Sequence, residues 1–240
     1  MKMTRLYVKD IGSFLLTFCK KDVIIYIESE RRNNMDFDRA EAREFIDEIL
    51  NFVEFETFLD NACEKNWENF ANSLGCCGNF IKWGATKGVV IFDNYVLKFP
   101  FVDEYINHCE REEKIYNGAI EENLEDFFCS IELFMDIDGY PIYVQPRVEV
   151  DENWAEEKSH DYLISDEVEE QEGWDMFSCE FSYEEQMIGL FLSDGLDRSI
   201  AYRLEEFFEE WEISDLHFGN VGYDDEGNWK LIDYAGFITV

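Results

Sequence analysis

The stretch that decides the fold is WEISDLHFGNVGYDDEGNWKLIDYAGF, which runs from Trp211 to Phe237. It contains Asp215, then Asn220 five residues later, and then Asp233 thirteen residues beyond that. The apolar lead-in before Asp233 suits a strand that delivers this carboxylate at its end. Asp and Asn are also common at helix ends and in turns. The role of these three residues can therefore be judged only together with the strands and helices that precede them.

Composition sets the broad class of the protein. The chain has 240 residues, of which 46% are hydrophobic and 17% aromatic, and this predicts a packed globule. Its net charge of -35, from 20 Lys and Arg against 55 Asp and Glu, argues against direct nucleic-acid binding and against binding to anionic membranes. Basic partners, or mimicry of the charge of nucleic acid, remain open.

Targeting signals and membrane spans are not expected. No apolar run approaches the roughly 18–20 residues that a membrane span needs. The opening MKMTRLYVKDIGSF has no signal-peptide core, so we expect an intracellular, cytoplasmic protein. The seven cysteines form no CxxC pair, and several lie in apolar runs, which favours buried reduced thiols over metal or disulfide roles; they are Cys19, Cys63, Cys76, Cys77, Cys109, Cys129 and Cys179.

The first 78 residues predict an N-terminal α+β extension. Residues 5–28 contain short apolar runs separated by turns, which indicates two or three strands. Residues 36–55 have helical periodicity with Asp36 or Asp38 as the cap, and residues 56–75 predict a second helix. Nothing in this extension points to chemistry.

From residue 79 the pattern changes. The sequence predicts three strands joined by tight turns over 79–101, an acid-rich helix over 103–124, and two strands around a DIDGYP turn over 127–150. Residues 151–182 carry twelve acids against the single Lys158, which predicts a solvated or mobile insertion, with a dedicated binding surface as the alternative. A helix pair broken near SDG follows over 182–211.

This order of parts, followed by D(x4)N and a final Asp, resembles the protein-kinase-like superfamily, which includes aminoglycoside and other small-molecule phosphotransferases. SDLHFGN, residues 214–220, is similar to the D-L-H-x-G-N form of phosphotransferases and of protein kinases carried by some bacterial viruses. The resemblance covers about 79–237. It implies an α+β, kinase-like two-lobed fold with an N-lobe and hinge at 79–150. The acidic insertion and a minimal C-terminal lobe would occupy 151–240.

The resemblance assigns roles to five polar side chains. It implies that Lys98, late in the third strand, reaches the α- and β-phosphates of ATP, with Glu112 of the next helix as its partner and Glu113 as the second choice. Asp215 would accept a hydrogen bond from the attacking hydroxyl. Asn220 and Asp233 would bind Mg²⁺, which prefers such hard oxygen ligands.

The resemblance also implies an ATP-binding surface. Gly84, Gly88 and Val90 in WGATKGVV would correspond to the glycine-rich loop. The segment YVQPRVEV would be the hinge, which places Gln145 and Arg147 near the adenine. Pro146 has no N–H to donate, so the hydrogen-bond donor to the base would be a neighbour of this proline.

Several positions depart from the family pattern. Trp83 and Ala85 stand where two glycines of the loop are expected, and a backbone without them approaches phosphates less easily. Ile213 and Ser214 precede Asp215, where protein kinases usually carry His-Arg. The D-F-G site reads D-Y-A-G, and no activation segment is expected before Val240.

The sequence therefore supports two main hypotheses. The first is an ATP- and Mg²⁺-dependent phosphotransferase, most simply one that phosphorylates protein Ser/Thr, since the acidic surface could attract a basic protein. The alternative is a catalytically weak or inactive kinase-fold protein that binds and blocks a basic partner, for example a nucleic-acid-binding protein. A small-molecule kinase ranks last, and a phage or mobile-element origin is suggested only by analogy.

Overall fold

The computed structural model describes residues 14–18, 23–27, 38–52, 57, 60, 62–63, 67, 80–102, 107–170 and 181–236. The chain divides into two compact units, Met1–Asn34 and Met35–Val240. In the first unit, β1 (Phe14–Phe18) and β2 (Val23–Ile27) form an antiparallel hairpin, as the sequence predicts. No helix within the described residues is long and apolar enough to cross a membrane.

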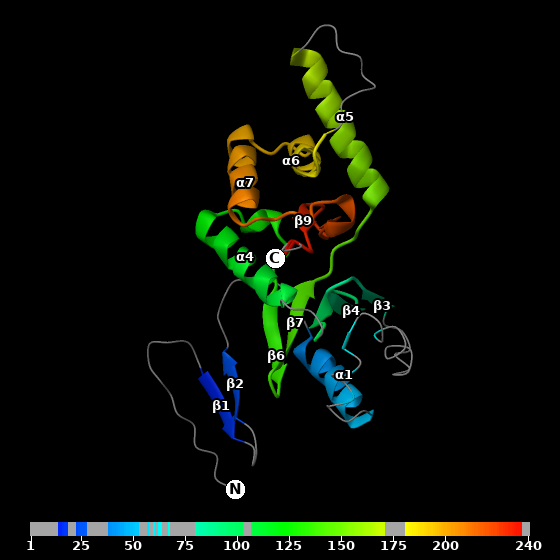
Figure 1. The fold of residues 1–240 in the computed structure, drawn as a ribbon, viewed down its shortest axis with the longest axis vertical. Helices are drawn as coiled ribbons and strands as arrows, with labels where there is room; N and C mark the ends of the chain where they lie inside the picture. The colour runs from blue at the N-terminus through cyan, green and yellow to red at the C-terminus, as the bar shows by residue number, and fades with distance from the viewer. Residues whose placement is uncertain are drawn as a thin grey trace. The chain divides into compact units, whose positions relative to one another are not determined.

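The second unit is built on a five-stranded antiparallel sheet with the strand order β3-β4-β5-β7-β6 (Figure 1). The strands are β3 (Phe80–Trp83), β4 (Lys87–Ile91), β5 (Tyr95–Pro100), β6 (Glu132–Ile137) and β7 (Tyr140–Pro146). The predicted DIDGYP turn joins β6 to β7, and Asp138 and Gly139 both adopt positive φ there, as a two-residue hairpin turn requires. The mixed α+β class predicted from the sequence is confirmed.

The two faces of this sheet belong to different hydrophobic clusters. Because strand side chains alternate between faces, Leu97 and Phe99 on β5 point to the face opposite that of Lys98. Leu97 and Phe99 join a cluster with Trp67 and with α1 (Arg39–Phe52). Asp38 caps α1 by accepting hydrogen bonds from the Ala40 and Glu41 amides, and α1 belongs to the same unit as the sheet rather than to the hairpin.

The indole of Trp67 fills the space beside Gly88 on β4. A Cβ at position 88 would lie 2.0 Å from Trp67 Cε2, whereas a Cβ at Gly84 would meet no atom within 4 Å. Trp67 also packs against Phe99 and Phe101. Glycine at position 88 is therefore required by packing on the α1 side of the sheet.

We expect Gly88→Ala to destabilise the protein by about 3 kcal/mol, because the added methyl group overlaps a buried ring that has little room to shift. Chemical denaturation measures the loss. Gly84→Ala is the matched control and should change the free energy of unfolding by less than about 0.5 kcal/mol. In a Trp67→Leu background the cost of Gly88→Ala should fall. An equal cost in both backgrounds would show that the indole is not the cause.

The other face of the sheet is covered by α4 (His108–Glu122) and by the C-terminal elements. Asn107 caps α4 by accepting a hydrogen bond from the Glu110 amide, and Asn123 ends it in a left-handed conformation. The buried side of α4 joins a second cluster, which holds Tyr143 of β7 together with residues of the C-terminal helices. The predicted helix over 103–124 is thus observed at 108–122.

Three helices lead to the C-terminal loops. α5 (Glu152–Glu170) packs against α6 (Tyr183–Ser193), and α6 against α7 (Arg198–Glu210), with the predicted break at Asp194 and Gly195 (Figure 1). The stretch predicted as a solvated insertion is helical as far as Glu170. The acids between Asp151 and Asp161, whose side chains are described, are exposed, but Ala155 and Ser159 are buried, and the Ser159 hydroxyl donates to the Gln186 carbonyl.

Parts of two sequence predictions, the second N-terminal helix and the reduced cysteines, lie outside the described residues. Most of the predicted helix over 56–75 lies there, as do Cys19, Cys76, Cys77 and Cys179. Among the described residues, Cys63, Cys109 and Cys129 are free thiols. Burial raises the pKa of both Cys109 and Cys129 to about 12, so these two thiols stay protonated and unreactive at neutral pH.

Candidate functional site

The site begins with an ion pair between the sheet and α4. Lys98 on β5 places its Nζ 2.6 Å from Glu112 Oε2 on α4, and both side chains are buried. The same Nζ donates to the Ile232 carbonyl at 2.7 Å, which ties this pair to the residue before Asp233. Glu113, the second choice, instead accepts a hydrogen bond from the Leu133 amide. The structure therefore brings Lys98 and Glu112 together.

A second lysine enters the same cluster. Lys87, the first residue of β4, donates to Glu112 Oε1 and also contacts Asp233 Oδ1 at 2.7 Å. Lys87 is only 3% exposed and Glu112 is fully buried. Two ammonium groups and two carboxylates therefore form one compact network among Lys87, Lys98, Glu112 and Asp233.

The network shifts the pKa of its members. Burial opposes the charge of Lys87, but the Asp233 and Glu112 carboxylates outweigh it and raise the pKa of Lys87 above its ordinary range. Asp233 is only partly exposed, and its loss of hydration opposes its charge, yet the ammonium groups of Lys87 and Lys98 lower the pKa of Asp233 to about 2. Burial raises the pKa of Glu112, and both lysines oppose that rise. Lys87 and Asp233 are accordingly charged at neutral pH.

The loop after α7 holds Asp215 and Asn220 next to each other. Asn220 Nδ2 donates to the Asp215 backbone oxygen at 2.9 Å and to Asp215 Oδ2 at 3.2 Å. His217 braces the loop, because its Nδ1 accepts from the Gly219 amide and its Nε2 lies 3.7 Å from Asp215 Oδ1. The short turn η2 (Phe218–Asn220) then leads into β8 (Val221–Tyr223).

A hairpin of β8 and β9 (Trp229–Leu231) delivers Asp233 to the same region. The Ile232 amide donates to the Asn220 carbonyl at 3.0 Å, so the segments that carry Asn220 and Asp233 are bonded together. Tyr234 is fully buried, packs edge-on against Phe128 and donates its hydroxyl to the Cys129 carbonyl. This tyrosine fixes the backbone on which Asp233 stands.

Asn220 and Asp233 each offer an oxygen atom of the kind that binds Mg²⁺. Because Asn220 uses its amide nitrogen on Asp215, its amide oxygen is left as the ligand atom. The Asp233 side chain is 38% exposed, so it can reach an incoming ion. No group of three or more His, Cys, Asp or Glu side chains among the described residues could hold a metal. Mg²⁺ commonly binds through one or two protein oxygens, with phosphates and water completing its shell.

The residues expected around the nucleotide lie in different places. Gly88 and Val90 are on the face of β4 that packs against Trp67 and α1, opposite the face of Lys98, while Gly84 is exposed at the β3–β4 turn. Gln145 pairs with Val96 on the Lys98 face and is buried, with its side-chain amide donating to the Cys129 carbonyl. Contact of Gly84, Gly88, Val90 and Gln145 with a nucleotide stays a prediction.

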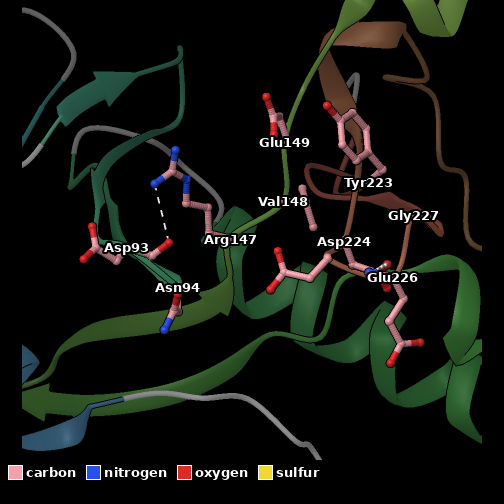
Figure 2. A pocket seen from close by; sticks show the side chains of 10 residues that line it. Asp93, Asn94, Arg147, Val148, Glu149, Tyr223, Asp224, Glu226 and Gly227 are labelled. Atoms are coloured by element: carbon pink, nitrogen blue, oxygen red, sulfur yellow. Dashed lines mark hydrogen bonds between the residues drawn. The ribbon is translucent and has the colours of Figure 1, made fainter.

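Arg147 lies on the border of a separate hollow. Its guanidinium donates to the Phe92 and Asp93 carbonyls of the β4–β5 turn, and its amide donates to the Asn94 carbonyl. Figure 2 shows this side chain directed toward Asp93. Its role beside an adenine stays a prediction, and its recorded hydrogen bonds point to the turn.

The hollow itself encloses about 520 Å³ and is strongly acidic. It shares no residue with the lysine–carboxylate network or with the Asp215 loop. Five carboxylates and one guanidinium give it a net negative charge; its lining is Asp93, Asn94, Arg147, Val148, Glu149, Tyr223, Asp224, Asp225, Glu226 and Gly227 (Figure 2).

Lys87 is the member of the network that the sequence reading does not assign. Strand alternation carries the missing signal, because Lys87 and Val89 must share a face of β4, and Val89 pairs directly with Lys98. Lys87 lies two residues before Val89, which pairs with Lys98. A correct prediction of this strand pairing would therefore have placed Lys87 in the same site as Lys98.

Comparison with protein-family models, with curated proteins and with solved structures finds no match for this chain.

Proposed function

We propose that the protein is an ATP- and Mg²⁺-dependent phosphotransferase with a protein-kinase-like two-lobed fold. The observation that carries the proposal is the buried Lys98–Glu112 pair, whose lysine also bonds to the residue before Asp233. In phosphoryl transfer by kinases, a strand lysine paired with a helix glutamate and a metal-binding aspartate act together. Here side chains from three distant segments meet in that combination.

The order and connection of the elements support the kinase-like part of the proposal. Three antiparallel strands carry Lys98 on the third, α4 follows with Glu112, and two further strands complete the sheet. The helix pair α6 and α7 then leads to the loop with Asp215 and Asn220 and to the hairpin before Asp233. The order matches the one that the family resemblance implies.

Each polar residue then has a task that its position allows. Lys98 would hold the phosphates of ATP from the sheet, with Glu112 fixing its direction. Asp215 would accept a hydrogen bond from the acceptor hydroxyl and orient it toward the γ-phosphoryl group. Asn220 and Asp233 would hold Mg²⁺, which supplies positive charge to the phosphate oxygens as the bond to the leaving group breaks.

The base of the nucleotide would bind at the hinge after β7. The Arg147 amide is already bonded to the Asn94 carbonyl, and the Glu149 amide to the Tyr223 carbonyl. Within the described residues, no hydrogen bond from the Val148 amide is recorded, which makes Val148 our choice of donor to the adenine ring. Protein is the proposed acceptor, because the net charge of -35 would attract a basic substrate over long range.

Nucleotide binding is the first test. At a concentration about a hundred times its Kd, MgATP should stabilise the protein by about 2.7 kcal/mol and raise the melting temperature by about 5–10 °C. Differential scanning fluorimetry measures this shift. Asp233→Asn should remove the part of the shift that depends on Mg²⁺, whereas Glu121→Gln, at an exposed position of α4, should leave it unchanged.

The acidic hollow is the observation that favours the alternative function, a kinase-fold protein that captures a basic partner. Five of its lining side chains are carboxylates, and it is independent of the lysine–carboxylate network. The MgATP melting experiment, combined with a capture assay at low and high salt, separates the two functions. A wild-type protein that shows no shift with MgATP, and that captures a basic protein at low but not at high salt, would support the alternative and contradict phosphotransfer.

A further inference from the structure

We propose that Lys87 is a second phosphate-binding residue, so that two lysines from neighbouring strands hold the triphosphate. This inference rests on the proposed function and names a residue of that site to which the family resemblance assigns no role. It is carried by the position of Lys87, whose ammonium group touches Glu112 on one side and Asp233 on the other.

The first argument is geometric. Lys87 Nζ lies 2.7 Å from Asp233 Oδ1, the carboxylate proposed to hold Mg²⁺. Mg²⁺ binds oxygen at about 2.1 Å, and the same ion would carry phosphate oxygens in its shell. A phosphate held next to Asp233 would therefore be close to the Lys87 ammonium, which already contacts this carboxylate.

The second argument concerns the backbone of the β3–β4 hairpin. A glycine-rich loop normally binds phosphates with its backbone N–H groups. In this hairpin the turn is tight, since the Gly84 amide donates to the Lys87 carbonyl, and the space at Gly88 is filled by Trp67 on the opposite face. A side-chain ammonium group from the same hairpin supplies the positive charge that this backbone is poorly placed to give.

The third argument is electrostatic. In the network, two ammonium groups balance two carboxylates, and the chain as a whole carries a net charge of -35. Removing Lys87 would leave Lys98 alone against Glu112 and Asp233. The remaining three groups would then carry more negative than positive charge, which opposes the binding of an anionic nucleotide.

With a nucleotide bound, Asp233 would hold Mg²⁺, and the Lys87 ammonium, which contacts this carboxylate in the free protein, could donate to a phosphate oxygen instead. Glu112 keeps its contacts with both lysines through its two oxygens. In the free protein, Lys87 therefore holds the metal-binding carboxylate in place.

The test compares ATP with adenosine, which has the same base and sugar but no phosphate. By isothermal titration calorimetry, Lys87→Met should weaken MgATP binding about tenfold to a hundredfold, since a charge-assisted hydrogen bond is lost. Its affinity for adenosine should stay within about twofold. Lys114→Met, which removes an exposed lysine of α4, is the control and should change neither affinity.

The results of these titrations distinguish a phosphate contact by Lys87 from a purely structural role. Equal losses for MgATP and adenosine would show that Lys87 only supports the fold, and an unchanged MgATP affinity would likewise overturn the assignment. A wild-type protein that binds neither ligand would overturn both this inference and the proposed function. Binding by the wild type with no selective effect of Lys87→Met would overturn only the inference.

A second measurement uses the wild-type chain and so does not depend on the folding of a variant. An acyl-phosphate derivative of ATP transfers its acyl group to a lysine amine beside the terminal phosphate and releases ATP. Mass spectrometry of the digested protein should find the acyl group on Lys87 as well as on Lys98. Acylation of Lys98 alone, or of neither lysine, would contradict a phosphate contact by Lys87.

Discussion

Replacing Asp215 by alanine is expected to lower the rate of phosphoryl transfer about a hundredfold to ten-thousandfold, the usual contribution of a positioned general base. The assay follows transfer of labelled phosphate from ATP to the chain itself and to a basic test protein such as a histone mixture. MgATP affinity should change little, because Asp215 is proposed to contact the acceptor hydroxyl and the proposed metal ligands are Asn220 and Asp233.

The control for this prediction is Glu121→Ala, which removes an exposed carboxylate of α4. It should leave the transfer rate unchanged. Asp215 also accepts a hydrogen bond from Asn220, so the folding of both variants should be compared by circular dichroism. Full activity in a folded Asp215→Ala protein would rule out the proposed mechanism.

The second large effect is expected at Glu112. This carboxylate is fully buried and accepts hydrogen bonds from Lys87 and Lys98. Removing one partner from a buried ion pair typically costs 3–5 kcal/mol, because the remaining charge is left without compensation. Lys87 would retain Asp233, and Lys98 would retain the Ile232 carbonyl, so we expect Glu112→Ala to cost about 3 kcal/mol, at the lower end of this range.

Urea denaturation measures this loss, and Glu121→Ala, at an exposed position of the same helix, is the matched control with an expected change below about 0.5 kcal/mol. Adding Lys98→Met to Glu112→Ala should recover part of the stability, because it removes a buried charge that has lost its partner. A cost below about 1 kcal/mol for Glu112→Ala would mean that water reaches the network.

The sequence predicts the local elements of this protein well where a single physical rule dominates. Alternating apolar residues and tight turns predict β3, β4, β5, β6 and β7, and the α4 helix is found within its predicted range. The pairing of Lys98 with Glu112 follows from family-like order, and the structure brings the two side chains together. The assignment of catalytic and metal roles to Asp215, Asn220 and Asp233 remains a prediction.

Long-range packing explains what the sequence does not reveal. The space beside Gly88 is filled by Trp67, which lies twenty-one residues earlier, so no local rule connects the two. The acid-rich helix α5 is expected to be solvated from its composition, but Ala155 and Ser159 are buried at positions spaced for one helical face. The sequence alone does not identify Lys87 as a site residue, because a lysine in a strand is ordinarily a surface residue.

The hydrogen bonds that Glu112 accepts from Lys87 and Lys98 also limit how the protein could be regulated. Lys87 and Lys98 come from two adjacent strands, and Lys98 is bonded in addition to the segment before Asp233. Swinging α4 outward would therefore break contacts to both strands at once and expose charged groups that water does not now reach. We therefore expect α4, which is held in its N-terminal half by these buried contacts, to stay in place, so that control of the site would have to act on access to it instead.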